Sequence, residues 1–168
     1  MKLSEINAMD RAAFVASLGG VFEHSPWVAK RAFDARPFAS VDALHGAMVA
    51  TMRTAPRDGQ LALVRAHPEL AGRAMVRNEL TADSTKEQAG AGLTQCTPDE
   101  YARLVDLNAR YNAKFGFPFI LAVKGYDRRG VIAEFARRVE RGVDEEFAEA
   151  LEQIARITRF RLDALLQH

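Results

Sequence analysis

The stretch that decides the fold runs from Thr97 to Val123 and reads TPDEYARLVDLNARYNAKFGFPFILAV. It opens with a capping box, Thr-Pro-Asp-Glu, whose proline takes the first helical position. Apolar side chains then follow at helical spacing up to Gly116, a residue typical of helix ends. They are Leu104, Leu107, Tyr111 and Phe115. The stretch therefore predicts one long helix over residues 97–116.

The residues that follow this helix, 117–123, do not continue its spacing. They are apolar, partly β-branched and start beside Pro118, a composition typical of extended chain. The sequence offers no second convincing strand, so we expect a buried extended segment. Its backbone N–H and C=O groups need hydrogen-bond partners. Either neighbouring side chains or a ligand would supply them.

Proline, glycine and capping residues divide the rest of the chain into pieces with helical periodicity. The expected helices start near Asn7, Ser25, Ser40, Asp58, Ser84, Asp127 and Asp144, and the last one ends at Gln167. Residues 69–80 predict a short helix or an irregular turn. We therefore expect one all-α domain over residues 1–168, a bundle of roughly seven to nine short helices with one extended segment near 117–123.

Composition excludes several classes of function. Lys and Arg total 23 against 22 Asp and Glu, and this balance argues against nucleic-acid binding. The single cysteine, Cys96, excludes an intrachain disulfide. No apolar stretch is long enough for a membrane helix or signal peptide, so we expect a cytoplasmic protein. Metal-binding, nucleotide-binding and serine-hydrolase motifs are missing, so we expect no metal site.

The first candidate for chemistry is His67, in the stretch RAHPEL at residues 65–70. Pro68 disfavours helical geometry in the residue before it, so His67 should end the preceding helix. The helix dipole favours a positive charge there, and such a histidine can donate a proton near neutral pH. A histidine that only caps the last carbonyls is the more common case, and this stretch alone does not separate the two.

Four further candidate residues lie on two predicted helices. Ser84 and Glu87 form a capping box, which needs no function, and Glu87 acts only if it faces a pocket. Gln88 adds an amide that both donates and accepts hydrogen bonds. Arg161 shares a helix face with Ile157 and Leu165. If it is partly buried it needs an anion, and a carboxylate fits its planar guanidinium. Most helical arginines, however, are solvated.

Four stretches occur in order along nearly the whole chain: EHSPWVAKRAF at 23–33, HPEL at 67–70, STKEQAGAGL at 84–93 and LNARYNAKFGFPFILAVKG at 107–125. Together they resemble the 2-oxo-4-hydroxy-4-carboxy-5-ureidoimidazoline (OHCU) decarboxylases, the last enzymes of the route from urate to (S)-allantoin. The resemblance implies an all-α fold, a small ureidoimidazoline substrate and a possible homodimer. It implies no cofactor, because the substrate's ring C=N accepts the electron pair that decarboxylation releases.

The resemblance also implies roles for particular residues. His67 would transfer a proton, with Glu87 and Arg161 as the other catalytic residues. The substrate-binding set would be Pro68, Ser84, Thr85, Lys86, Glu87, Gln88, Phe119, Ile120, Leu121, Ala122 and Val123. Two alternatives stay open: a non-catalytic helical protein-interaction domain, and a decarboxylase of a related ureido acid.

Overall fold

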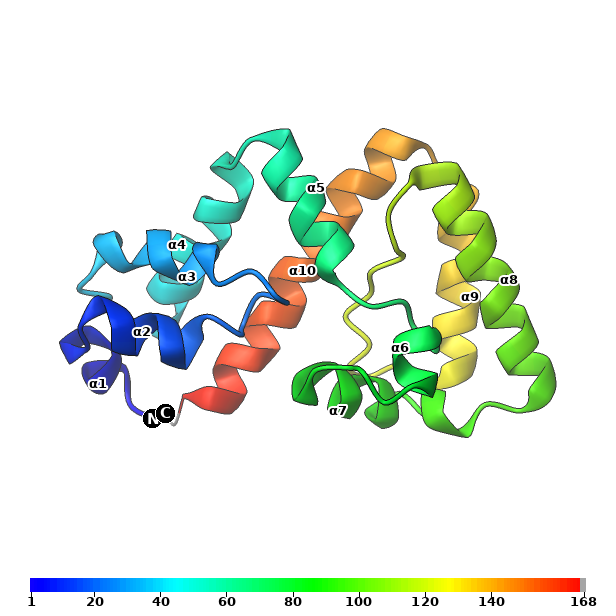
Figure 1. The fold of residues 1–168 in the computed structure, drawn as a ribbon, viewed down its shortest axis with the longest axis horizontal. Helices are drawn as coiled ribbons and strands as arrows, with labels where there is room; N and C mark the ends of the chain where they lie inside the picture. The colour runs from blue at the N-terminus through cyan, green and yellow to red at the C-terminus, as the bar shows by residue number, and fades with distance from the viewer. Residues whose placement is uncertain (167–168) are drawn as a thin grey trace. The chain divides into compact units, whose positions relative to one another are not determined.

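The computed structural model describes residues 1–166, and all regular secondary structure in this range is helical (Figure 1). This confirms the predicted all-α class. The helices group into two compact units, Met1–Ala66 with Ile154–His168, and His67–Gln153. No helix within residues 1–166 is long and apolar enough to cross a membrane. The predicted helix end at Gln167 lies outside the described residues, and the single domain over 1–168 stays a prediction.

The first unit contains the N-terminal helices and the second part of the last helix. Its elements are α1 (Leu3–Ala8), α2 (Arg11–Leu18), α3 (Trp27–Ala32), η1 (Phe33–Ala35), α4 (Val41–Thr54), α5 (Arg57–Ala66) and the end of α10 (Val143–Leu165). Helix α3 packs against α2 and α4. Phe14 lies fully buried at this core and meets Phe33 edge to face, with 5.4 Å between ring centroids.

The second unit contains the short helices of the middle of the chain and the long helix α8. Its elements are α6 (Arg73–Val76), α7 (Ala82–Gly90), η2 (Leu93–Gln95), α8 (Pro98–Phe115), α9 (Arg128–Arg138) and the start of α10. Helix α8 packs against α9, as Figure 1 shows. Aromatic side chains fill the space beside α8: Tyr111 packs against Phe115, Phe119 and Phe135, and the last two rings stack 3.9 Å apart.

The start and end signals of α8 are where the sequence predicts them. The Thr97 hydroxyl accepts a hydrogen bond from the Glu100 N–H, and the Glu100 carboxylate accepts one from the Thr97 N–H. Gly116 ends the helix in the left-handed region, with φ of 75°. These contacts satisfy helix-end groups that have no partner inside the helix. Helices α4 and α9 likewise start after their predicted caps, Ser40 and Asp127.

The predicted start of the first helix at Asn7 is wrong. Asn7 lies inside α1, and its side chain exchanges two hydrogen bonds with the backbone of Phe38, at 2.8 and 2.9 Å. Asp10 instead caps a second helix, α2, by accepting from the Ala13 N–H. The sequence pattern misleads here because an amide that suits a helix cap also suits a distant backbone segment.

The predicted helix start at Ser84 is also wrong. The cap of α7 is Thr81, whose hydroxyl accepts from the Ser84 N–H at 3.2 Å. Ser84 is the third residue of the helix, and its side chain is buried. Both residues carry a hydroxyl three positions before a possible partner, so local sequence does not select between them. The true start turns Ser84 and Gln88, four residues apart, onto the same buried face.

Residues 118–123 form neither helix nor strand, and every residue from 117 to 123 is buried. This confirms that the segment expected after α8 is buried and belongs to no helix. In Figure 1 it is the yellow-green trace that leads from the end of α8 toward α9. Because it lies inside the second unit without a sheet partner, its polar backbone groups depend on side chains from the helices around it.

Candidate functional site

His67 is the first residue after α5, so the helix ends where Pro68 predicts. The side chain is buried, with 7% of its surface exposed, whereas Pro68 is half-buried. The protein therefore encloses His67, whose role in proton transfer stays a prediction.

The loop that follows His67 is braced by amide side chains. The Gln88 Oε1 atom accepts from the Ala71 N–H at 2.9 Å, and its Nε2 donates to the Glu69 carbonyl at 3.2 Å. The Asn108 Nδ2 atom donates to the Leu70 carbonyl at 2.9 Å. Three consecutive residues after Pro68 are thus bonded by buried side chains from α7 and α8. We call residues 67–71 the histidine loop.

Backbone geometry explains the residues at the end of the histidine loop. Ala71 has a φ of 51°, a left-handed conformation that is uncommon for a residue with a side chain. A Cβ atom at Gly72 would lie 2.7 Å from the Cβ atom of Glu69, so only glycine fits there without a shift. The Gln88 contact to the Ala71 N–H holds this strained turn in place. The path of the chain after His67 is therefore fixed from several sides.

Helix α7 presents its predicted site residues in three different environments. Ser84 and Gln88 are buried, Glu87 is half-buried, and Thr85 and Lys86 are exposed. The observed contacts of Gln88 are to the histidine loop, so in this structure it positions the main chain that carries His67.

The irregular segment at 117–123 is held by two buried side chains from later helices. The Nη1 atom of Arg138 donates to the Ile120 carbonyl at 2.7 Å. The Ala122 N–H donates to the Oε1 atom of Gln153 at 2.9 Å. The Arg138 guanidinium also lies over the ring of Phe119, 4.3 Å from its centroid. Side chains thus supply part of the hydrogen bonding that this segment needs.

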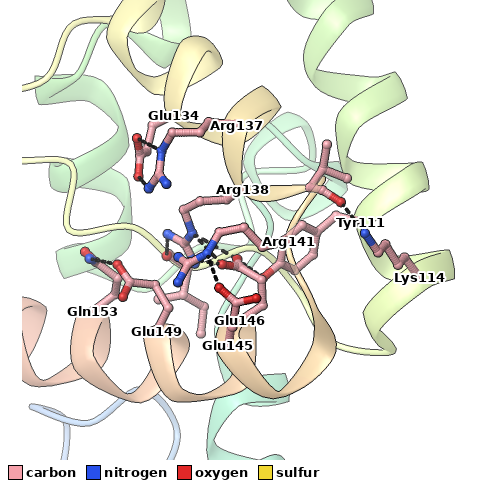
Figure 2. Close-up of polar contacts among 12 residues, drawn as sticks. Tyr111, Lys114, Glu134, Arg137, Arg138, Arg141, Glu145, Glu146, Glu149 and Gln153 are labelled. Atoms are coloured by element: carbon pink, nitrogen blue, oxygen red, sulfur yellow. Dashed lines mark hydrogen bonds and ion pairs between the residues drawn. The ribbon is translucent and has the colours of Figure 1, made fainter.

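Arg138 belongs to a buried group of charged and polar side chains (Figure 2). Its Nε atom donates to Glu146 at 2.9 Å, and both side chains are fully buried. The carboxylate of Glu146 also accepts from the Tyr111 hydroxyl at 2.6 Å and from Arg141 at 3.1 Å. Burial, together with the hydrogen bond to the Glu146 carboxylate, raises the pKa of Tyr111 well above its ordinary value. The Tyr111 hydroxyl therefore stays a hydrogen-bond donor.

Arg161 is the predicted site residue that belongs to the first unit, whereas the others belong to the second. Its side chain is 5% exposed and ion-paired with the buried carboxylate of Glu23 at 2.8 Å. The same Nη1 atom donates to the Val21 carbonyl at 3.2 Å. The prediction that a buried Arg161 needs a carboxylate is confirmed, and Glu23 meets that need in this structure. Its contact with substrate stays a prediction.

Sequence reasoning missed the side chains that brace the two irregular stretches of the second unit. Asn108 lies on the apolar face of α8, four residues after Leu104 and three before Tyr111. Glu146 and Gln153 lie seven residues apart on one face of α10. A polar residue at a buried helical position is the signal that would have found them. For Glu146 and Gln153 this signal was hidden because charged residues are frequent throughout α10.

Residues 7–163 match the family model described as OHCU decarboxylase. The chain is 41% identical to the OHCU decarboxylase of Haloferax volcanii over 162 residues, which is 96% of this chain and 94% of that protein. It is 39% identical to the mouse (Mus musculus) protein of that name, over 99% of this chain and 93% of that protein.

Solved structures resemble this chain in fold. A crystal structure of (S)-allantoin synthase superposes with a TM-score of 0.78 and 28% identity, covering 99% of this chain and 54% of that chain. This chain therefore spans about half the length of that protein. A crystal structure of OHCU decarboxylase in the presence of (S)-allantoin has a TM-score of 0.69 and 20% identity, covering 94% of this chain and 98% of that chain. With a family match across most of its length and near-full-length relatives, this chain belongs to the OHCU decarboxylase family.

Proposed function

We propose that this chain decarboxylates 2-oxo-4-hydroxy-4-carboxy-5-ureidoimidazoline to (S)-allantoin in urate degradation. The observation that carries the proposal is the near-full-length match to proteins that bear this name. The structure supports it through a buried histidine on a braced loop, at the position that the resemblance assigns to proton transfer.

The reaction needs no external electron acceptor. When the bond between the ring carbon and the carboxylate breaks, its electron pair forms a C=C bond to the neighbouring carbon. The electrons of the ring C=N move to nitrogen, which takes up a proton. The product at this stage is CO2 and an enol. The enol hydroxyl then loses its proton and the neighbouring carbon gains one, which gives the ketone, and the face of this protonation sets the chirality of allantoin.

The protein's tasks are to fix the ring, to move the hydroxyl proton and to protect one face. We assign the proton transfer at the hydroxyl to His67, a role worth about 10²–10⁴ in rate for a general acid or base. The half-buried Glu87 orients the imidazole or the substrate hydroxyl. Arg161 is proposed as the third catalytic residue, with Glu23 as its resting partner.

The proposed substrate-binding set keeps Pro68 and the two predicted runs, residues 84–88 and 119–123. The second run is supported by its buried, irregular backbone, which offers main-chain donors and acceptors to the ureide. No cofactor enters this proposal. The cytoplasmic location expected from the sequence and the homodimer implied by the resemblance are further parts of it.

The experiment that tests this function uses the unstable substrate as it forms. Urate oxidase and hydroxyisourate hydrolase generate it from urate, and the purified protein is added. Circular dichroism then follows the product, because the spontaneous reaction gives racemic allantoin. We expect (S)-allantoin to accumulate faster than in the background, with a dichroic signal that scales with protein concentration. Decay at the spontaneous rate with no dichroic signal would refute the proposal.

A further inference from the structure

The peptide groups on either side of Leu121 are each bonded at one end only. Arg138 occupies the Ile120 carbonyl, and Gln153 occupies the Ala122 N–H. In a trans peptide the C=O and N–H groups point in opposite directions. The N–H of Leu121 therefore points away from Arg138, and the carbonyl of Leu121 points away from Gln153.

Leu121 is buried, with 4% of its surface exposed, yet within residues 1–166 its N–H and C=O groups have no hydrogen-bond partner. None of the hydrogen bonds within residues 1–166 involves the N–H or the C=O of Leu121. Buried backbone groups are nearly always paired in native proteins. The Leu121 N–H can donate to a ligand and the Leu121 C=O can accept from it. A ureide fits this pair, because it carries a carbonyl acceptor next to an N–H donor.

The two bracing side chains also strengthen these groups. A hydrogen bond to one end of a peptide polarises the other end, so a guanidinium on the Ile120 carbonyl makes the Leu121 N–H a better donor. The Gln153 amide oxygen on the Ala122 N–H makes the Leu121 carbonyl a better acceptor in the same way. The charge of Arg138 is balanced inside the protein by Glu146, which fixes the guanidinium at this position.

We propose that Arg138 and Gln153 are positioning residues that orient and polarise the backbone of Leu121 to bind the ureide group of the substrate. This inference rests on the proposed function, and it adds the residue that reads the ureide and the two side chains that prepare it. Neither side chain touches the ligand in this account. Arg138 acts through the Ile120–Leu121 peptide group, and Gln153 acts through the Leu121–Ala122 peptide group.

The first test compares matched variants on one helix. Arg138→Met removes the bond to Ile120, whereas Arg137→Met removes an exposed arginine that pairs with Glu134 on the same helix. We expect Arg138→Met to raise KM and to weaken (S)-allantoin binding by roughly three- to ten-fold, the size of one or two weakened hydrogen bonds. Arg137→Met should leave both unchanged. Allantoin affinity equal in the two variants would overturn the inference.

A second variant keeps the test possible if Arg138→Met does not fold. Arg138→Met leaves Glu146 with fewer partners, so the double variant Arg138→Met with Glu146→Leu removes both buried charges, a change that proteins often tolerate. Gln153→Leu carries no charge change and tests the other side of Leu121. Its control is Glu149→Ala, which removes the second contact of Gln153 but keeps its bond to Ala122. Arg138→Lys should recover part of the lost affinity.

A spectroscopic test follows Leu121 itself. In protein labelled with ¹⁵N-leucine, with the peak assigned by Leu121→Ile, addition of (S)-allantoin should shift the Leu121 amide proton downfield. The shift should shrink in Arg138→Met and Gln153→Leu. If wild-type protein forms and binds allantoin while the Leu121 peak stays in place, this inference fails and the proposed function stands. If wild-type protein neither forms nor binds it, both fail.

Discussion

The histidine loop and the segment at 117–123 both lie outside helices, and the protein holds them by different chemistry. Neutral amides brace the histidine loop, with Gln88 and Asn108 each bonded to its backbone. The segment at 117–123 is held by one amide, Gln153, and by the charged Arg138, which is itself bonded to Glu146. The amide brace satisfies the loop over three consecutive residues. In the segment at 117–123, Arg138 and Gln153 each bond one peptide group beside Leu121, and in our proposal the N–H and C=O of Leu121 remain for a ligand.

The different side chains that hold the two segments fit the different roles that we propose for these segments. An amide can both donate and accept, so one Gln88 closes two backbone bonds and fixes the loop without placing a charge beside His67. A buried guanidinium is costly unless it is paired, but once paired it polarises the peptide that it contacts. The two braces should therefore fail by different amounts when a partner is removed.

The largest expected effect comes from Glu146→Leu, which leaves the fully buried Arg138 without its carboxylate. Breaking one side of a buried ion pair typically costs about 3–5 kcal/mol. We expect the free energy of unfolding, measured in urea, to fall by about that amount. The exposed neighbour Glu145, which pairs with Arg141, is the control, and Glu145→Leu should change it by less than about 0.5 kcal/mol. Equal losses in both variants would show that the charged brace has no special role.

A smaller effect is expected from Gln88→Leu, which removes the partners of the Ala71 N–H and the Glu69 carbonyl. Leaving buried polar groups unpaired costs about 1–3 kcal/mol. The variant should lose about 2 kcal/mol of stability, and kcat should fall because the loop no longer fixes His67. Gln95→Leu, at an exposed position, is the matched control. A Gln88→Leu protein with wild-type kcat would remove the amide brace from the account.

The smallest effect is expected from Tyr111→Phe, and it depends on pH. The hydroxyl donates to the Glu146 carboxylate, so its loss should cost roughly 1.5 kcal/mol near neutral pH. Because the pKa of Tyr111 is raised in the folded state, its stabilising contribution is complete below about pH 10, the ordinary value for tyrosine. Above that pH the unfolded chain releases the proton first.

The advantage of wild type over Tyr111→Phe should therefore shrink by about 1.36 kcal/mol for each pH unit above about pH 10. Urea unfolding of both proteins between pH 9 and about 11.5 measures this slope. Parallel stability curves across that range would contradict a raised pKa for Tyr111.

Local signals predicted much of the fold. The capping box at Thr97, the left-handed Gly116 and the helix end before Pro68 are decided by residues next to each other in sequence, and the structure has them where expected. The starts at Asn7 and Ser84 were wrong because each side chain fits more than one local role. Asn7 bonds to Phe38, a residue 31 positions away, which no local pattern contains.

For the candidate site, too, local sequence signals predicted some residues and missed those that depend on distant contacts. His67 was found because a proline follows it, and Arg161 because it shares a face with apolar residues. The carboxylate that Arg161 requires, Glu23, lies 138 positions earlier in the chain and was not identified. The partners Arg138 and Glu146 were missed because α9 and α10 carry many charges, and only packing shows which of them are buried.

The most direct test of the account is His67→Asn, measured for both turnover and binding. The amide keeps the size and polarity of the site but does not exchange a proton near neutral pH. We expect kcat for (S)-allantoin formation to fall at least about 100-fold, while affinity for (S)-allantoin stays within about three-fold of wild type. Turnover close to the wild-type rate would contradict the assignment of proton transfer to His67.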